Sequence, residues 1–139
     1  MIPVKLACSL TVAAAAWLPV DASAQVRAKA DVACQPTAQS LAYDCAITLT
    51  DLRTGEPLSG VTLTVGADMP SMPMMHNVQA VKATAEQEPG RYRARLVLEM
   101  HGDWALQLNI SGASRDRVVA IVRFEPGRAI PEAPSGRKR

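Results

Sequence analysis

The stretch "RYRARLVLEM" at residues 91–100 decides the fold class, because its polar and apolar residues alternate one by one. One side of an extended chain would carry the apolar residues Tyr92, Ala94, Leu96, Leu98 and Met100. The other side would carry Arg91, Arg93, Arg95 and Glu99, and only Val97 departs from the pattern. A period of two predicts a strand with one face on a core and the other face in water.

The alternation resumes in "WALQLNI" at residues 104–110, with Trp104, Leu106, Leu108 and Ile110 on one face. Only "HGD" (101–103) separates this segment from the first, so we expect the two strands to form a hairpin. Further strands are predicted at 44–52, 59–67 and 117–124, with weaker ones at 26–34 and 77–84, and the turn "RTGEP" (53–57) joins the first two. Seven short strands predict an all-β fold, an immunoglobulin-like antiparallel β-sandwich.

The two ends of the chain differ from this middle part. Residues 1–24 read as an export signal, with Lys5, an apolar run over 6–20 and an A-x-A cleavage site at 22–24. An uncleaved anchor is the alternative, although the run is shorter than the ~20 residues that a spanning helix needs. We therefore predict a cleaved signal peptide (1–24), a periplasmic domain without a membrane span (25–125), and a flexible basic tail (126–139) rich in Pro and Gly.

The charge balance, the cysteines and the lack of catalytic motifs limit the classes of function that this chain could have. The chain has 15 Lys and Arg against 13 Asp and Glu, and this balance argues against general nucleic-acid binding. Cys34 and Cys45 would meet oxidising conditions after export, so we predict a disulfide across two neighbouring strands; thiolate metal ligands, which must stay reduced, are the alternative. We expect no enzyme, because no phosphate-cradling glycine loop, nucleophile–base spacing or carboxylate pair stands out.

Residues 69–76, "MPSMPMMH", hold four of the six methionines and one of the two histidines of the chain. Thioether and imidazole donors favour copper over calcium or magnesium, and thioethers favour Cu(I). In a strand, Met72, Met74 and His76 would share one face about 6.5 to 7 Å apart, which makes them the first-choice ligands. In a polyproline II segment, Met69, Met72 and Met75 would share a face at ~9 Å per step, too far apart without a bend.

A second Met-His pair, Met100-His101, follows the first alternating strand. Alternation places Met100 in the core, whereas His101 could join His76 if the two loops meet at one end of the sandwich. Met69, Met75 and His101 are therefore the second-choice ligands. Trp104 could offer a cation–π contact to a metal, but its alternation favours a core position. Two other interpretations of the methionine segment remain: an exposed apolar contact for a partner, and sacrificial oxidation of methionines.

Several of these motifs together resemble the YtkA-like and FixH-like family of small exported β-sandwich domains. The resemblance rests on "TGEPLSGVTLTVGADMPSMPMMH" (54–76) and "PGRYRARLVLEMHGDWALQL" (89–108), and it covers about residues 44–124. The family elements are a T-G-x-P turn (54–57), an M-P-x-M element (69–72), a G-x-Y strand (90–92) and a G-x-W strand (102–104). It implies an immunoglobulin-like fold outside the cytoplasmic membrane and a link to copper handling, by delivery to oxidases or by efflux.

This chain departs from the family in two respects. FixH-type proteins usually keep a membrane anchor, whereas this chain is predicted to be cleaved free, and the Cys34/Cys45 pair lies outside the family elements. The resulting hypothesis is a periplasmic copper-binding protein, a Cu(I) carrier or buffer whose partner is a copper donor or acceptor protein of the cell envelope. The alternative hypothesis is an immunoglobulin-like interaction module of an envelope complex, with the methionine-rich loop as an apolar contact.

Overall fold

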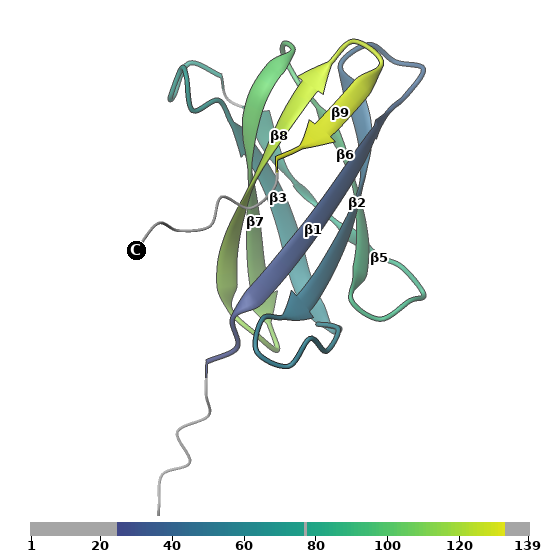
Figure 1. The fold of residues 1–139 in the computed structure, drawn as a ribbon, viewed down its shortest axis with the longest axis vertical. Coiled ribbons are helices and arrows are strands. Elements are labelled where there is room, and N and C mark those ends of the chain that lie inside the picture. Colours follow the sequence, from purple (N-terminus) through teal and green to yellow (C-terminus); the bar gives the residue numbers. More distant parts are fainter. Residues whose placement is uncertain (1–24, 77, 133–139) are drawn as a thin grey trace, which may run out of the picture.

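The computed structural model describes residues 25–76 and 78–132, which form two antiparallel sheets (Figure 1). The predicted signal peptide (1–24) and the last part of the predicted tail (133–139) lie outside the described residues. The strands are β1 (Ala28–Pro36), β2 (Ala42–Asp51), β3 (Val61–Asp68), β4 (Val78–Lys82), β5 (Thr84–Ala85), β6 (Arg91–Val97), β7 (Gly102–Gly112), β8 (Asp116–Glu125) and β9 (Arg128–Pro131). The described part of the chain contains no helix of a length and apolarity that would cross a membrane.

One sheet has the strand order β1-β2-β6-β5, and the other has the order β4-β3-β7-β8-β9. The alternation in the sequence is the alternation of burial: Tyr92, Ala94 and Leu96 of β6 are buried between three exposed arginines. In β7 the buried positions are Trp104, Leu106, Leu108 and Ile110. Val97, the exception to the pattern, is 51% exposed on the outer face. The predicted all-β sandwich is confirmed.

The predicted hairpin between residues 91–100 and 104–110 is wrong, because β6 and β7 belong to different sheets. Strand β6 ends at Val97, and residues 98–101 cross from one sheet to the other, with Leu98 buried on the way. The turn that follows β2 makes a similar crossing to β3. Alternation shows which side chains face the core, but two strands that face each other across a sandwich alternate just as two hydrogen-bonded neighbours do.

The structure also adds strands to the seven expected ones. The predicted strand at 77–84 divides into β4 and β5, which join different sheets on either side of the buried Ala83. Strand β9 lies where the flexible tail was predicted to begin, and it pairs with the end of β8. The Glu132 amide then donates a hydrogen bond to the Ile121 carbonyl (2.9 Å). The sandwich therefore extends beyond the predicted boundary at residue 125.

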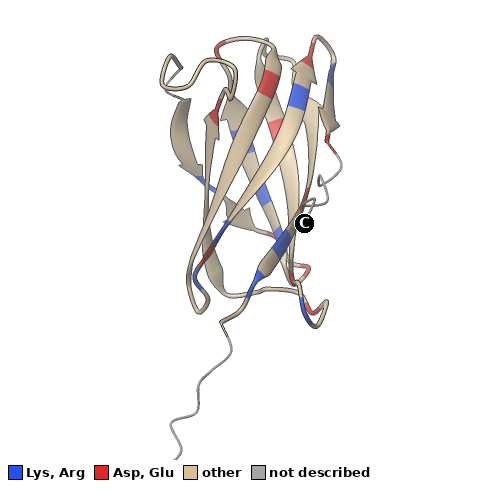
Figure 2. Ribbon diagram, turned by 60° about the vertical axis from the view of Figure 1, so that its left-hand side comes forward, with Lys and Arg blue, Asp and Glu red and all other residues tan. Residues whose placement is uncertain are grey.

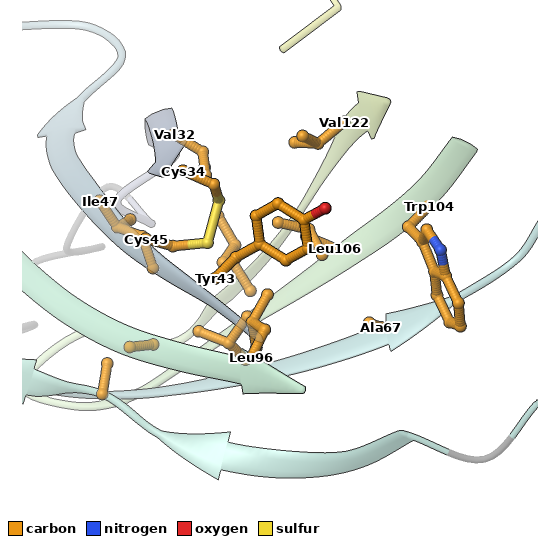
Figure 3. Close-up of a cluster of buried hydrophobic side chains, with 14 of the residues drawn as sticks. Val32, Cys34, Tyr43, Cys45, Ile47, Ala67, Leu96, Trp104, Leu106 and Val122 are labelled. Atoms are coloured by element: carbon orange, nitrogen blue, oxygen red, sulfur yellow. A yellow bond between two sulfur atoms is a disulfide. The ribbon is translucent and has the colours of Figure 1, made fainter. Parts of the chain in front are cut away.

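The predicted disulfide is confirmed, and it joins directly opposed residues of β1 and β2. Cys34 and Cys45 are both buried in the core beside Tyr43 (Figure 3). The Tyr43 ring packs edge-on against Phe124, with ring centroids 4.6 Å apart. The Tyr43 hydroxyl donates a hydrogen bond to the Glu125 carbonyl (3.0 Å). The bridge thus ties the edge strand β1 to the sheet close to where the two sheets pack together.

Replacing both cysteines by alanine should lower the free energy of unfolding by about 2 to 4 kcal/mol, because the bridge restricts the unfolded chain. Urea denaturation of the double variant beside the oxidised wild type measures the loss. Reduction of the wild type should reproduce most of it without any change of sequence. Equal unfolding midpoints for the oxidised and reduced wild type would contradict the prediction.

Along the strands and loops seen in Figure 2, positions of Lys and Arg are interspersed with positions of Asp and Glu rather than gathered by sign. The three arginines of β6 each meet a carboxylate: Arg91 with Glu88, Arg93 with Glu86, and Arg95 with Asp44. Hydrogen bonds from the Arg95 guanidinium lower the pKa of Asp44 below its ordinary value. The three arginines that alternate with the apolar residues of β6 therefore form a row of exposed ion pairs.

Candidate metal-binding loop

The methionine-rich segment forms two successive turns after β3. The Met72 amide donates to the Met69 carbonyl (3.1 Å), and the Met75 amide donates to the Met72 carbonyl (3.3 Å). Pro70 and Pro73 each stand second in a turn, where a fixed φ of about −65° suits the backbone. The predicted strand geometry, in which Met72 shares one face with residues 74 and 76, is therefore wrong for this segment.

The turns supply the bend that the other methionine face requires. The first and fourth residues of a β-turn have Cα atoms less than about 7 Å apart, compared with ~9 Å in polyproline II. Met69 and Met72 are the ends of the first turn, and Met72 and Met75 are the ends of the second. The turns thus bring the Cα atoms of Met69 and Met72, and those of Met72 and Met75, closer together than a polyproline II segment would.

The four methionines differ strongly in burial. Met69 is 4% exposed and belongs to the hydrophobic core, and Met72 is partly buried against that core. Met74 and Met75 are 95% and 74% exposed. Met74 also has a φ of 66°, a left-handed conformation that the third position of such a turn usually leaves to glycine or asparagine. The loop therefore has a buried inner part and an exposed tip.

His76 closes the loop against the connection between β6 and β7. Its Nδ1 atom contacts the Glu99 carboxylate, and its ring lies beside the Trp104 ring with centroids 5.9 Å apart. The His76 side chain is 19% exposed. The two loops therefore meet at one end of the sandwich, as the sequence analysis required for a shared site (Figure 1).

Trp104 is the core residue that the alternation predicted, and it is fully buried. It lies on the far side of the core from the Cys34–Cys45 bridge (Figure 3). Its Nε1 donates a hydrogen bond to the Met100 carbonyl (3.1 Å), which holds the 98–101 connection in place. Because the Trp104 ring also lies beside the His76 ring, it forms a buried surface against which the histidine packs.

Met69, which directly follows β3, lies close to the start of β7. Asp68 pairs with Ala105, so the next residue lies level with Trp104 on the neighbouring strand. A Cβ atom added to Gly102 would lie only 2.9 Å from Met69 Cε, and Gly102 has a φ of +140°. The end of the Met69 side chain therefore packs against Gly102, the first residue of β7.

The second Met-His pair lies on that connection. Met100 is 38% exposed, so its predicted core position is wrong, because the alternation stops soon after β6 ends. His101 is half-buried beside Gly102. The contact that joins the two loops is made by Glu99 and His76, and His101 lies two residues beyond Glu99 in the chain.

Two further observations concern the charged and potential metal-binding side chains at this end of the sandwich. Arg123 donates hydrogen bonds to Asp103 (2.6 and 3.1 Å), and these lower the pKa of the Asp103 carboxyl below its ordinary value. Within residues 25–76 and 78–132, no group of three or more His, Cys, Asp or Glu side chains is placed to hold a metal ion. The candidate donors at this end are instead thioethers and imidazoles.

Comparison of the sequence with models of protein families shows to which family this chain belongs. The model of the YtkA-like family matches residues 22–109, which include both loops described above. This chain belongs to the YtkA-like family. The match ends within β7, so β8 and β9 of this YtkA-like protein lie beyond the matched region. No curated protein and no solved structure matched the chain.

Sequence reasoning missed Glu99 as a member of the site. It placed Glu99 on the polar face of a strand with the arginines, whereas the strand ends two residues earlier. Its partner His76 is 23 residues away in the chain, and no local sequence pattern predicts a contact over that separation. The turns at residues 69–75 did have a signal, since a proline stands second in each of them.

Proposed function

We propose that this YtkA-like protein is a periplasmic copper-binding protein, a Cu(I) carrier or buffer and not an enzyme. The observation that supports the proposal most is the meeting of two loops at one end of the sandwich. Half-buried His76 contacts Glu99 and lies beside Trp104, and the end of the buried Met69 side chain lies next to Gly102, two residues before Trp104. Thioether and imidazole donors together suit Cu(I) better than they suit calcium or magnesium.

The inner and outer parts of the loop would have different tasks. Met69, Met72 and His76 are the donors that we expect to hold the ion, because folding already restricts them. Met74 and Met75, being exposed, can meet a donor or acceptor protein and exchange one ligand at a time. A carrier needs this combination, since it must be selective and still release its cargo.

The periplasmic location is supported by two features of different kinds. The first 24 residues have the layout of an export signal. The Cys34–Cys45 disulfide fits a compartment in which thiols become oxidised. A protein in that compartment can exchange copper with partners in the cell envelope.

The test is an anaerobic titration of the exported, processed chain with Cu(I) against a chromogenic competitor. We expect stoichiometric binding by the wild type, and loss of binding when Met69 and Met72 are replaced by Leu and His76 by Gln. Met100→Leu is the matched control, because it removes a thioether outside the loop and should leave binding unchanged. A wild type that does not compete for Cu(I) would overturn the proposal.

The exposure of Met74 and Met75 favours a second candidate, an interaction module of an envelope complex. Two large apolar side chains at the tip of a loop are suited to contact another protein. This function requires no metal. It is the one that would remain if the wild type failed to bind Cu(I) in the titration.

A further inference from the structure

We propose that Glu99 is a positioning residue that holds His76 in one tautomer, with the proton on Nδ1 and with Nε2 free to bind the metal. The metal part of this inference rests on the proposed function, whereas the tautomer does not. The contact between His76 Nδ1 and Glu99 Oε2 is its starting point.

The tautomer follows from the donor and acceptor chemistry of the pair. An ionised carboxylate can only accept hydrogen bonds, so the nitrogen that faces it must carry the proton. A neutral imidazole has one protonated and one free nitrogen, and the hydrogen bond made by one nitrogen determines the state of the other. With Nδ1 donating to Glu99, the lone pair available to a metal is that of Nε2.

The ring is also restrained against turning over. The His76 ring packs beside Trp104 at 5.9 Å with an angle of 58° between the planes, and the tryptophan is fully buried. A half-turn of the ring would bring a carbon against the carboxylate and leave Nδ1 without its partner. Trp104 and Glu99 therefore restrain the imidazole from two directions.

Glu99 can position the histidine because its own backbone is held on both sides. The Leu98 amide donates to the Leu41 carbonyl (2.9 Å), and Leu98 is 3% exposed. On the other side, the Met100 carbonyl accepts the Trp104 indole hydrogen bond (3.1 Å). A residue held in this way can fix the geometry of a neighbouring ligand, although its own side chain is 52% exposed.

The expected effect on metal binding is large for a residue that does not touch the ion. A carboxylate that accepts the second ring N–H orients a ligating histidine and makes it a stronger donor, and losing such a partner typically weakens metal affinity by about 10- to 100-fold. Its negative charge also offsets the charge of Cu(I) bound to neutral thioethers and imidazole.

The experiment combines a tautomer measurement with a binding measurement. Long-range ¹H–¹⁵N NMR correlations of the metal-free protein, at a pH where imidazole is neutral, should show His76 protonated on Nδ1. Glu99→Ala should shift His76 toward protonation on Nε2, whereas Glu99→Gln, which keeps an acceptor oxygen but adds a donor, should shift it less. Cu(I) affinity should fall by about 10- to 100-fold in Glu99→Ala and by less in Glu99→Gln.

Glu88→Ala is the matched control, since it removes the same charge from an exposed ion pair with Arg91 outside these two loops. It should change neither the tautomer nor the affinity. Protonation of His76 on Nε2 in the wild type would overturn the inference whether or not copper binds. An unchanged Cu(I) affinity in Glu99→Ala would overturn the positioning role. Absence of any Cu(I) binding by the wild type would overturn the proposed function, while the NMR result would still decide the tautomer.

Discussion

Replacing Gly90 by alanine should lower the free energy of unfolding by about 3 kcal/mol, the largest loss that we expect from adding one methyl group. Gly90 has a φ of +76°, which disfavours any side chain. An added Cβ atom would also lie 2.7 Å from the Leu49 carbonyl oxygen and 2.8 Å from Pro57 Cβ. Neither neighbour is the end of a flexible side chain, so the backbone itself would have to move.

That movement would break other contacts of the same residue. The Gly90 carbonyl accepts a hydrogen bond from the Leu49 amide (2.8 Å), and its own amide donates to Ser59 Oγ (3.1 Å). Gly90 therefore joins the start of β6 to the end of β2 and to the connection that follows β2. The G-x-Y element of the sequence is in this respect structural.

Gly55→Ala is the matched control for Gly90→Ala. Gly55 has nearly the same φ (+75°), but a Cβ atom added to it would have no neighbour within 4 Å. This variant should lose only about 1 kcal/mol from the backbone conformation. Urea denaturation of both variants measures the difference. Equal losses would show that the close approach to Leu49 contributes nothing.

The second large effect concerns the inner and outer donors of the loop. Changing Met69 to Leu together with His76 to Gln should weaken Cu(I) binding by roughly a hundredfold or more, at least the effect of losing a supporting residue. Changing Met74 to Asn together with Met75 to Ser should weaken it by less than about tenfold, because both side chains point into solvent. Competition titrations of the two double variants measure the contrast.

Stability measurements separate this contrast from unfolding. Leucine nearly matches methionine in volume, so Met69→Leu should cost less than about 1.5 kcal/mol. Asparagine tolerates the left-handed backbone at Met74, so that change should leave the free energy of unfolding equal or higher. If the outer variant lost as much Cu(I) affinity as the inner one, the ion would be held at the tip of the loop.

The fold class and the inward-facing residues could be predicted from the sequence. Strand alternation is a local property of the backbone, so the alternating pattern was enough to assign Tyr92, Leu96 and Trp104 to the core. The Cys34–Cys45 bridge was also predictable, because both cysteines lie in neighbouring strand segments after a predicted export signal, and export would bring them into oxidising conditions.

The sheet to which each strand belongs was not predictable from the same pattern. Residues 98–101 could have turned back as a hairpin or crossed to the other sheet, and both choices leave the alternation of β6 and β7 unchanged. The choice depends on how all the inward side chains pack together, which is a property of the whole core. The error about Met100 has the same origin, since its place depends on where β6 ends.

The methionine-rich segment at residues 69–76 likewise has some features that the sequence determined and others that it did not. By itself the sequence determined a segment rich in soft donors, because residue type alone makes thioether and imidazole suitable for copper. Only the tertiary structure decided that Met69 lies inside, that Met74 lies outside, and that His76 faces Glu99. Burial and contacts between distant residues arise from packing two sheets against each other, and that packing is not a local property of any eight residues.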